Sequence, residues 1–140
     1  MNEKNMCLAV VDMSKNIEQG GFYYSGKAET FDEKKRLIGA MNNPDFRISD
    51  MINKVINVVD IYIEQASITN KDTGEISLIP RTVLIDDKGK SYAALSYGVF
   101  NSIKKIIGVF GFPDTWEEPI PLEVTRIVKG DRQIYNLIVK

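Results

Sequence analysis

Apolar runs and polar turns follow one another in a regular order after about residue 50. The run Val55 to Ile63 is dense in β-branched residues, and the polar stretch Thr69 to Gly74 separates it from a second apolar run, Glu75 to Ile85. A four-residue turn, Asp86-Asp87-Lys88-Gly89, leads into a short third run, Lys90 to Leu95. β-Branched runs bounded by turn residues are typical of strands. The pattern therefore predicts a meander of three strands.

Two details predict irregularities within these strands. Ile56 and Val58 fall on one face of the first run, whereas Val59 and Ile61 fall on the other, so a bulge near Val58 is expected to bend a long strand. Pro80 cannot donate a hydrogen bond to a neighbouring strand, so we expect it at a sheet edge or a bulge.

The periodicity changes from strand to helix after Ser96. Ser96 is a suitable N-cap, Gly111 is placed to end the helix in a left-handed conformation, and Pro113 prevents its continuation. Apolar residues fall on one broad helical stripe: Val99, Phe100, Ile103, Ile106, Ile107 and Phe110. Two more strands are predicted after the helix, Ile120 to Val128 and Arg132 to Val139, with a turn at residues 129–131.

Three strands, a helix and two more strands are the elements of an OB-fold, in the order β-β-β-α-β-β. This five-stranded Greek-key barrel most often binds oligonucleotides or oligosaccharides on one face and between two of its loops. An SH3-like barrel also has five strands, but it lacks a helix of this length between the third and fourth. We therefore predict a mainly β OB-fold domain over residues 48–140, with other small α+β sandwiches as the alternative.

The first 47 residues differ from this pattern. Residues 1–27 show no sustained period and predict a flexible N-terminal arm, in which Gly20 and Gly21 precede an aromatic cluster, Phe22, Tyr23 and Tyr24. These rings either dock on a neighbouring subunit, stack on bases, or pack back on the protein's own barrel. The first alternative makes them candidates for self-association.

Residues 28–47 predict an N-terminal helix and a linker. Thr30 and Glu33 have the spacing of a capping box, in which each side chain satisfies a backbone N–H of the other residue. The stretch Asn42-Asn43-Pro44 is expected to end this helix.

Composition argues against metal sites and catalysis. The 140 residues fit one domain with an extension, and they include one cysteine, Cys7, and no histidine. A zinc site needs several such ligands, and the missing histidine also removes the commonest general base. Adjacent carboxylates at residues 86–87 and 117–118 lie in polar turns and are expected to be solvated. We therefore expect no metal, no cofactor and no enzymatic activity.

No apolar run reaches the length of a membrane span. The apolar segment Met6 to Val11 is also too short for the core of a signal peptide. We therefore expect a cytoplasmic protein that does not contact a membrane.

Overall charge does not suggest a nucleic-acid-binding protein, but the distribution of charge does. The formal net charge is −1, which gives no general positive footprint. Between Arg81 and Lys105, however, the sequence has five basic residues and two acidic ones, whereas carboxylates cluster at residues 114–118. A locally positive groove on a nearly neutral protein is compatible with this distribution.

Cations and aromatic rings occur where an OB-fold binds its ligand, namely on the second and third strands and in two loops. The candidate DNA-binding residues are Lys71 in the first loop, Arg81 on the second strand, Lys88, Lys90 and Tyr92 near the third strand, Lys129 and Arg132 in the last loop, and Tyr62 and Tyr135 on the outer strands. The alternative is that the tyrosines belong to the core or its rim and that the loop lysines are simply solvated.

Four segments also carry a family resemblance: residues 48–54 (ISDMINK), 80–86 (PRTVLID), 98–105 (GVFNSIKK) and 115–120 (TWEEPI). Over about residues 28–140 this combination resembles small single-stranded-DNA-binding proteins encoded by phages and conjugative plasmids of Gram-positive bacteria. The resemblance implies an OB-fold that coats single-stranded DNA during replication or conjugative transfer, with self-association along the strand.

Two functional hypotheses follow. The first is a sequence-nonspecific single-stranded-DNA-binding protein that coats or protects the strand and forms a homo-oligomer through its N-terminal arm. The second is an OB-fold protein-interaction module that recruits a replication or transfer protein, with weak or no DNA binding.

Overall fold

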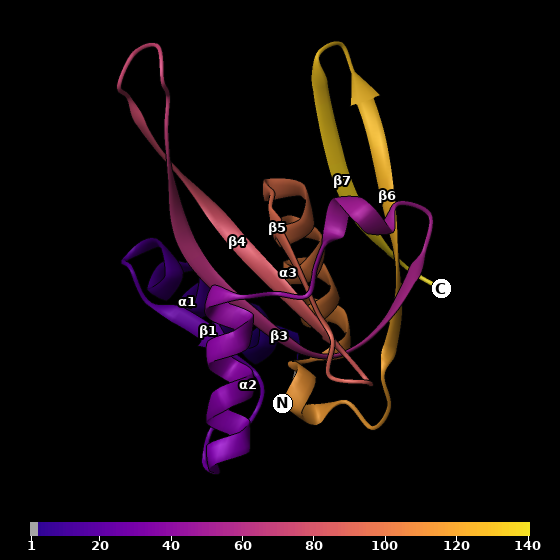
Figure 1. Ribbon diagram of the computed structural model, residues 1–140. Helices are drawn as coiled ribbons and strands as arrows, with labels where there is room; N and C mark the ends of the chain where they lie inside the picture. The colour runs from indigo at the N-terminus through magenta and orange to yellow at the C-terminus, as the bar shows by residue number, and fades with distance from the viewer. Residues whose placement is uncertain (1–2) are drawn as a thin grey trace.

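A computed structural model describes residues 3–140 (Figure 1). The strands are β1 (Phe22–Tyr24), β2 (Phe46–Arg47), β3 (Val55–Thr69), β4 (Ile76–Asp86), β5 (Ser91–Leu95), β6 (Ile120–Lys129) and β7 (Arg132–Val139). The α-helices are α1 (Glu3–Glu18), α2 (Phe31–Asn42) and α3 (Tyr97–Phe110), and two short 3-10 helices are η1 (Ile48–Met51) and η2 (Pro113–Thr115).

All seven strands form one curled sheet in the order β2-β5-β4-β3-β6-β7, with β1 paired to β3. The long strand β3 organises it, because its first residues pair with β6 and the rest pair with β4. The register of β3 with β4 shifts between Val58 and Asp60, which confirms the predicted bulge. The bend at this point lets β3 pair with β6 before the bulge and with β4 after it, so that one strand belongs to both parts of a half-barrel.

Two cores lie on opposite faces of the sheet. The larger is formed by the sheet, α3 and the apolar side of α1, and it includes the fully buried residues Ile61, Leu84 and Ile103. The smaller lies under α2 and contains Ala40 and Tyr62. Both faces of the central strands are therefore covered.

Two hairpins extend beyond these cores. Figure 1 shows the β3–β4 and β6–β7 hairpins projecting toward the same end of the molecule with their tips apart, and the β4–β5 turn at the other end. Pro80 lies where β5 ends and β4 continues into the projecting hairpin. Its carbonyl accepts a hydrogen bond from the Ser96 N–H, on the side of β5. The N–H that proline lacks would point to the same side, where the pairing with β5 has already ended at Leu95. Pro80 therefore occupies an edge position, as predicted.

Helix α3 forms as its sequence predicts. The Ser96 hydroxyl accepts a hydrogen bond from the Val99 N–H at 3.2 Å. The predicted apolar stripe is buried from Val99 to Ile107, whereas Phe110 is 49% exposed. The helix ends at Gly111, whose φ of 91° and ψ of 172° lie in a region reserved for glycine, although not in the left-handed helical region that was predicted. At its other end, a side chain at Gly98 would collide with the Tyr135 carbonyl oxygen, so α3 packs closely on β7.

The mainly β prediction is confirmed, whereas the five-strand order of an OB-fold is not. The β5 strand does not pair with β7; its free edge pairs in parallel with β2. One reason is that α3 starts directly after β5 and covers the edge of β7, where the Leu137 N–H donates to the Ser102 hydroxyl at 3.2 Å. The sheet is thus a half-barrel that is compatible with an OB-like architecture.

The prediction of a flexible arm over residues 1–27 is wrong for the described part of that segment. Val10, Met13 and Ile17 recur at helical spacing, and their burial against the main core explains why α1 is helical here. The strand β1 then pairs with β3 over all three of its residues. Residues 1–2 lie outside the described chain.

The predicted helix in residues 28–47 is confirmed as α2. Both hydrogen bonds of the capping box are present, since the Glu33 N–H donates to the Thr30 hydroxyl at 3.1 Å and the Thr30 N–H donates to Glu33 Oε1 at 2.9 Å. The hydrogen bond from the Thr30 N–H to the Glu33 carboxylate lowers the pKa of that carboxyl. Asn43 follows the last helical residue, as expected.

Candidate functional site

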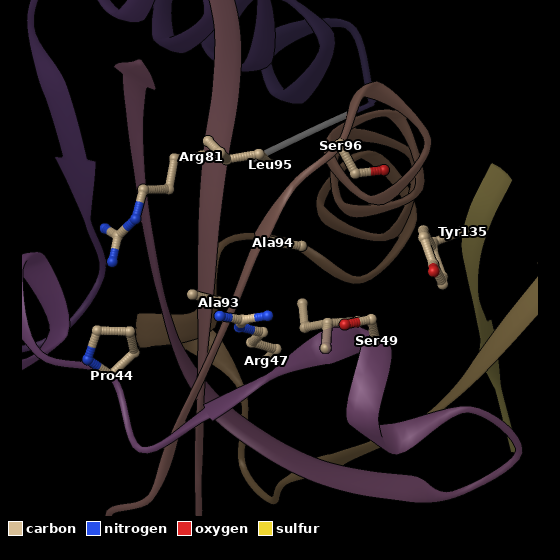
Figure 2. Close-up of a pocket in the computed structure, with 10 residues that line it drawn as sticks. Pro44, Arg47, Ser49, Arg81, Ala93, Ala94, Leu95, Ser96 and Tyr135 are labelled. Carbon is tan, nitrogen blue, oxygen red and sulfur yellow. The ribbon is translucent and has the colours of Figure 1, made fainter. Parts of the chain in front are cut away.

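A groove of about 510 Å³ lies between the β5 edge and β7, where a closed barrel would have paired strands. It is lined by Pro44, Arg47, Ile48, Ser49, Arg81, Ala93, Ala94, Leu95, Ser96 and Tyr135. Figure 2 shows Arg81 at one side and Tyr135 at the other, with the Arg47 guanidinium between them beside Ala93. None of these ten described residues is acidic, so the groove combines two cations, one aromatic ring and a floor of small side chains.

The segment that carries Arg47 is fixed to β5 by a polar clamp and an aromatic stack. The Ser91 N–H and hydroxyl both donate to Asp45 Oδ2, at 3.0 and 3.2 Å, while the Asp45 N–H donates to the Ser91 hydroxyl at 3.0 Å. Next to this clamp the rings of Phe46 and Tyr92 stack at 5.2 Å. The parallel pairing of β2 with β5 completes the attachment. Arg47 therefore projects from a wall whose backbone is held in place.

Arg81 is engaged with its own protein. Its guanidinium contacts Glu64 Oε1 at 3.2 Å and donates to the carbonyl of Ala40, near the C-terminal end of α2, at 3.3 Å. A cation is favourable near a helix C-terminus, so Arg81 joins β4 to β3 and α2. Part of its charge is offset by Glu64, whereas Arg47 is exposed. Arg47 is thus the cation that the groove offers most directly to a ligand.

Main-chain polar groups border the groove floor. The β2 strand pairs with β5 only at Tyr92 and Ala93, so the β5 edge beyond them is open. Because the Ser96 N–H points to β4, where it bonds to Pro80, alternation along the strand turns the N–H and C=O of Leu95 toward the open edge. The floor therefore offers a donor and an acceptor between apolar side chains.

Tyr135 is half-buried on β7, and its hydroxyl donates to Gln133 Oε1 at 2.9 Å. It stands opposite Arg126 in the β6–β7 register. Directly paired residues share a face of the sheet, so Arg126 lies on the same side of the hairpin as Tyr135. Arg126 is exposed and adds a third cation on that side.

Two predicted tyrosines, Tyr62 and Tyr92, do not reach the surface. Tyr62 is 1% exposed, beneath Phe22 and Tyr24, and its hydroxyl donates to Glu64. Burial raises the pKa of Tyr62. Tyr92 is 7% exposed, and burial together with its hydrogen bond to Asp86 raises its pKa to about 12. Neither ring has a face available to a base, which corrects the expectation that they form part of a surface site.

The predicted cations lie at different ends of the molecule. Lys71, Lys129 and Arg132 occupy the two hairpin tips, whereas Lys88 and Lys90 are in the β4–β5 turn at the opposite end (Figure 1). All five are exposed. Of the predicted residues, only Arg81 and Tyr135 line the groove itself.

The β4–β5 turn has a clear structural organisation. Asp86 Oδ1 accepts the N–H groups of Lys88 and Lys90, both at 2.9 Å, and Oδ2 accepts the Tyr92 hydroxyl at 2.8 Å. The Asp86 carboxylate therefore shapes the turn.

The aromatic cluster of residues 22–24 packs on the chain itself, which was the last of the three alternatives. The rings of Phe22 and Tyr62 are 5.6 Å apart, and those of Tyr23 and Phe112 are 5.5 Å apart. Burial raises the pKa of Tyr23 and of Tyr24. Phe22 remains about half exposed, and the prediction that the cluster mediates self-association stays a prediction.

Arg47, Arg126 and the β5 edge were not predicted. Arg47 precedes a 3-10 helix and belongs to a two-residue strand, so no periodicity marked it. Arg126 could have been found, because it lies two residues from Val124 and from Val128 and so shares their face of β6. The open edge depends on the missing β5–β7 pairing and has no signal in the sequence.

Among residues 9–140, whose side chains the structure describes, no group of three or more histidine, cysteine, aspartate or glutamate side chains is arranged to hold a metal ion. None of the helices described there combines the length and hydropathy of a membrane span.

Comparison with protein families gives a match. The family described as "Phage Single-stranded DNA-binding protein" matches residues 18–138, which include every strand of the sheet up to Ile138. Searches of curated proteins and of solved structures each gave no match.

Proposed function

Because the chain belongs to the phage single-stranded DNA-binding protein family, we propose that it is a sequence-nonspecific protein that coats or protects single-stranded DNA. The process we propose for this role is phage replication or plasmid conjugation. The observation that carries the site is a groove with two arginines, a tyrosine and no carboxylate among its lining residues. Single-strand binding without sequence readout needs this pairing of cations and aromatic faces.

We further propose that the half-barrel is an OB-fold that binds the strand in the groove at the open β5 edge and between the two hairpins. Arg47 and Arg126 would contact phosphates, and Tyr135 would stack on a base. The small side chains of Ala93 and Ala94 leave room for the strand to approach the open β5 edge. The tip residues Lys71, Lys129 and Arg132 would extend the contact outward from the groove.

The near-neutral charge sets an expectation for salt dependence. Binding that neutralises Z phosphates on a single strand loses affinity with a slope of about −0.7Z in log K against log salt. Two to four cations at the groove therefore predict a slope of roughly −1.4 to −2.8. Such a modest slope would leave a large share of the affinity to stacking.

The test is fluorescence anisotropy with labelled oligo-dT and a duplex of the same length, over a salt series. We expect tighter binding to oligo-dT and a slope in the stated range. Absence of oligo-dT binding at low salt, or stronger binding to the duplex, would contradict the proposal.

A second candidate is the protein-interaction module. Exposed apolar side chains favour it, notably Ile76 at 66% and Val128 at 60% exposure, as does the net charge of −1. Reversing Arg47 and Arg126 to glutamate separates the two functions, because both residues are exposed and neither forms an ion pair among the described side chains of residues 9–140. Loss of oligo-dT binding with an unchanged circular dichroism spectrum supports DNA binding, and unchanged binding supports the module.

A further inference from the structure

The edge of β5 is open at Leu95. The β2 strand pairs with β5 only at Tyr92 and Ala93, and the chain then turns away into η1, whose first residue, Ile48, is fully buried in the main core. Within residues 3–140, no other strand pairs with Leu95 on that side. One backbone donor and one backbone acceptor are therefore left free at the groove floor.

These two groups have a fixed orientation. Leu95 lies opposite Arg81 in the antiparallel register of β5 with β4. The following residue, Ser96, donates its N–H to the Pro80 carbonyl at 3.3 Å, and its hydroxyl caps α3. In an antiparallel ladder, pairs that bond to each other alternate with pairs whose N–H and C=O point outward. The Leu95 N–H and C=O therefore point away from β4, from a backbone that is held on both sides.

The side chains of the groove offer little means of reading a base. None of the ten described lining residues carries an amide or a carboxylate, the groups that recognise adenine and cytosine in base-specific contacts. Arg81 is engaged with Glu64, and Ala93 and Ala94 are small and apolar. The backbone of Leu95 thus gives the groove a neutral donor–acceptor pair that belongs to no side chain.

Every base carries a donor beside an acceptor on its Watson–Crick edge. Adenine and cytosine have an amino group beside a ring nitrogen, and guanine and thymine have a ring N–H beside a carbonyl. A base that turns over reverses the order of donor and acceptor and still presents a face for stacking. In a duplex these edges are occupied by the complementary strand, whereas in a single strand they are free. An open strand edge is therefore suited to any base, provided that the base is unpaired.

We propose that the β5 edge at Leu95 hydrogen-bonds the Watson–Crick edge of one base, and that this contact makes the groove select single strands over duplexes. The Leu95 N–H donates to the acceptor of the base, and the Leu95 C=O accepts from its donor. Tyr135 lies across the groove, where it would stack on a base (Figure 2).

The inference rests on the proposed function and names the part of the nucleotide that the groove recognises. It also gives a physical reason for binding without sequence readout, because all four bases satisfy the same two backbone groups. Open strand edges take peptide strands as well. Two arginines and no carboxylate in the lining favour a nucleic acid at this edge, since a peptide backbone carries no charge for the arginines to neutralise.

The first test changes the base and leaves the protein intact. Fluorescence anisotropy compares labelled oligo-dT with an oligonucleotide of the same length in which difluorotoluene replaces thymine. Difluorotoluene keeps the shape and the stacking face of thymine but is a poor hydrogen-bond partner. Wild type should bind it at least about fivefold more weakly, because two hydrogen bonds are lost. The control is oligo-dU, which lacks only the methyl group outside the Watson–Crick edge and should bind within about twofold of oligo-dT.

The second test removes the donor from the protein. Leu95→Pro deletes the N–H at an edge position where proline is tolerated, and the matched control Leu95→Ala deletes the same side chain but keeps the N–H. Leu95→Pro should bind oligo-dT about two- to tenfold more weakly than Leu95→Ala. Its preference for oligo-dT over a duplex of the same length should fall by a similar factor. The loss caused by difluorotoluene should be smaller in Leu95→Pro than in Leu95→Ala, since one of the two hydrogen bonds is already absent.

The outcomes separate this contact from DNA binding itself. Equal binding of oligo-dT and the difluorotoluene oligonucleotide by wild type would overturn the inference and leave the proposed function in place, and it is the result expected if the edge takes a peptide strand instead. Equal binding by the Leu95→Pro and Leu95→Ala proteins, with intact folds by circular dichroism, would also overturn it. If Leu95→Pro does not fold, the comparison of the two oligonucleotides on wild type decides. A wild type that binds neither oligonucleotide at low salt would remove the proposed function and this inference with it.

Discussion

Tyr135→Ala is expected to weaken oligo-dT binding without changing its salt dependence. The ring lines the groove opposite Arg81, and its hydroxyl bonds to Gln133 on the same strand rather than to the core. Stacking of one base on an aromatic side chain contributes about 1–3 kcal/mol. Since 1.4 kcal/mol is a factor of ten, the dissociation constant should rise about 5- to 150-fold.

The assay is anisotropy with labelled oligo-dT at several salt concentrations, with Tyr135→Phe as the matched control. The phenylalanine variant keeps the stacking face and should bind within about twofold of wild type. Because no cation is removed, the salt slope of Tyr135→Ala should equal that of wild type. Equal affinities for the alanine variant and wild type would refute the assignment of Tyr135 as a stacking residue, provided that thermal unfolding shows an intact fold.

Three further substitutions have defined outcomes. Arg47→Ala should reduce the salt slope by about 0.7, whereas Lys88→Ala, at the other end of the molecule, should leave it unchanged; equal slopes for both would contradict the groove assignment. Within the described chain the buried Thr82 hydroxyl has no hydrogen-bond partner, so Thr82→Val should stabilise the fold by about 1 kcal/mol, measured by urea unfolding, and a loss of stability would count against this reading. Burial raises the pKa of the Asp60 carboxyl, although the Ser25 hydroxyl donates to it at 2.9 Å. The folded state therefore holds a proton that the unfolded chain releases, and wild type loses stability as pH rises from about 4 through the raised pKa. Asp60→Asn should lack this loss, so the free energy of unfolding of the variant should increase relative to that of wild type as pH rises through this window. A difference between the two proteins that stays constant with pH would contradict the raised pKa of Asp60.

Local features of the fold were predictable because they depend on neighbouring residues. The capping box at Thr30, the N-cap at Ser96 and the bulge near Val58 each follow from the steric and hydrogen-bonding needs of a few residues. Long-range features were not predictable in this way. The two-residue strand β2 depends on its pairing with β5, and the cover of the β7 edge by α3 depends on a contact between Ser102 and Leu137, 35 residues apart.

The errors about the site have a common origin in the first 47 residues. Tyr62 was a candidate because it lies on the first strand of the expected barrel, yet β1 and α2 cover the face on which it lies. Arg47 was missed because its position depends on the Asp45–Ser91 clamp, which joins residues 46 positions apart. Arg81 and Tyr135 were predicted from strands of the expected barrel, and the half-barrel does bring them to one groove.

The most direct test of the central claim is to map the binding surface by heteronuclear NMR, titrating labelled protein with unlabelled oligo-dT. The account predicts that the largest amide shifts fall on Arg47, Ser49, Tyr135 and residues 93–96 of the groove, with smaller shifts at the hairpin tips. Shifts confined to the β4–β5 turn or to α2, with the groove resonances unchanged, would contradict it.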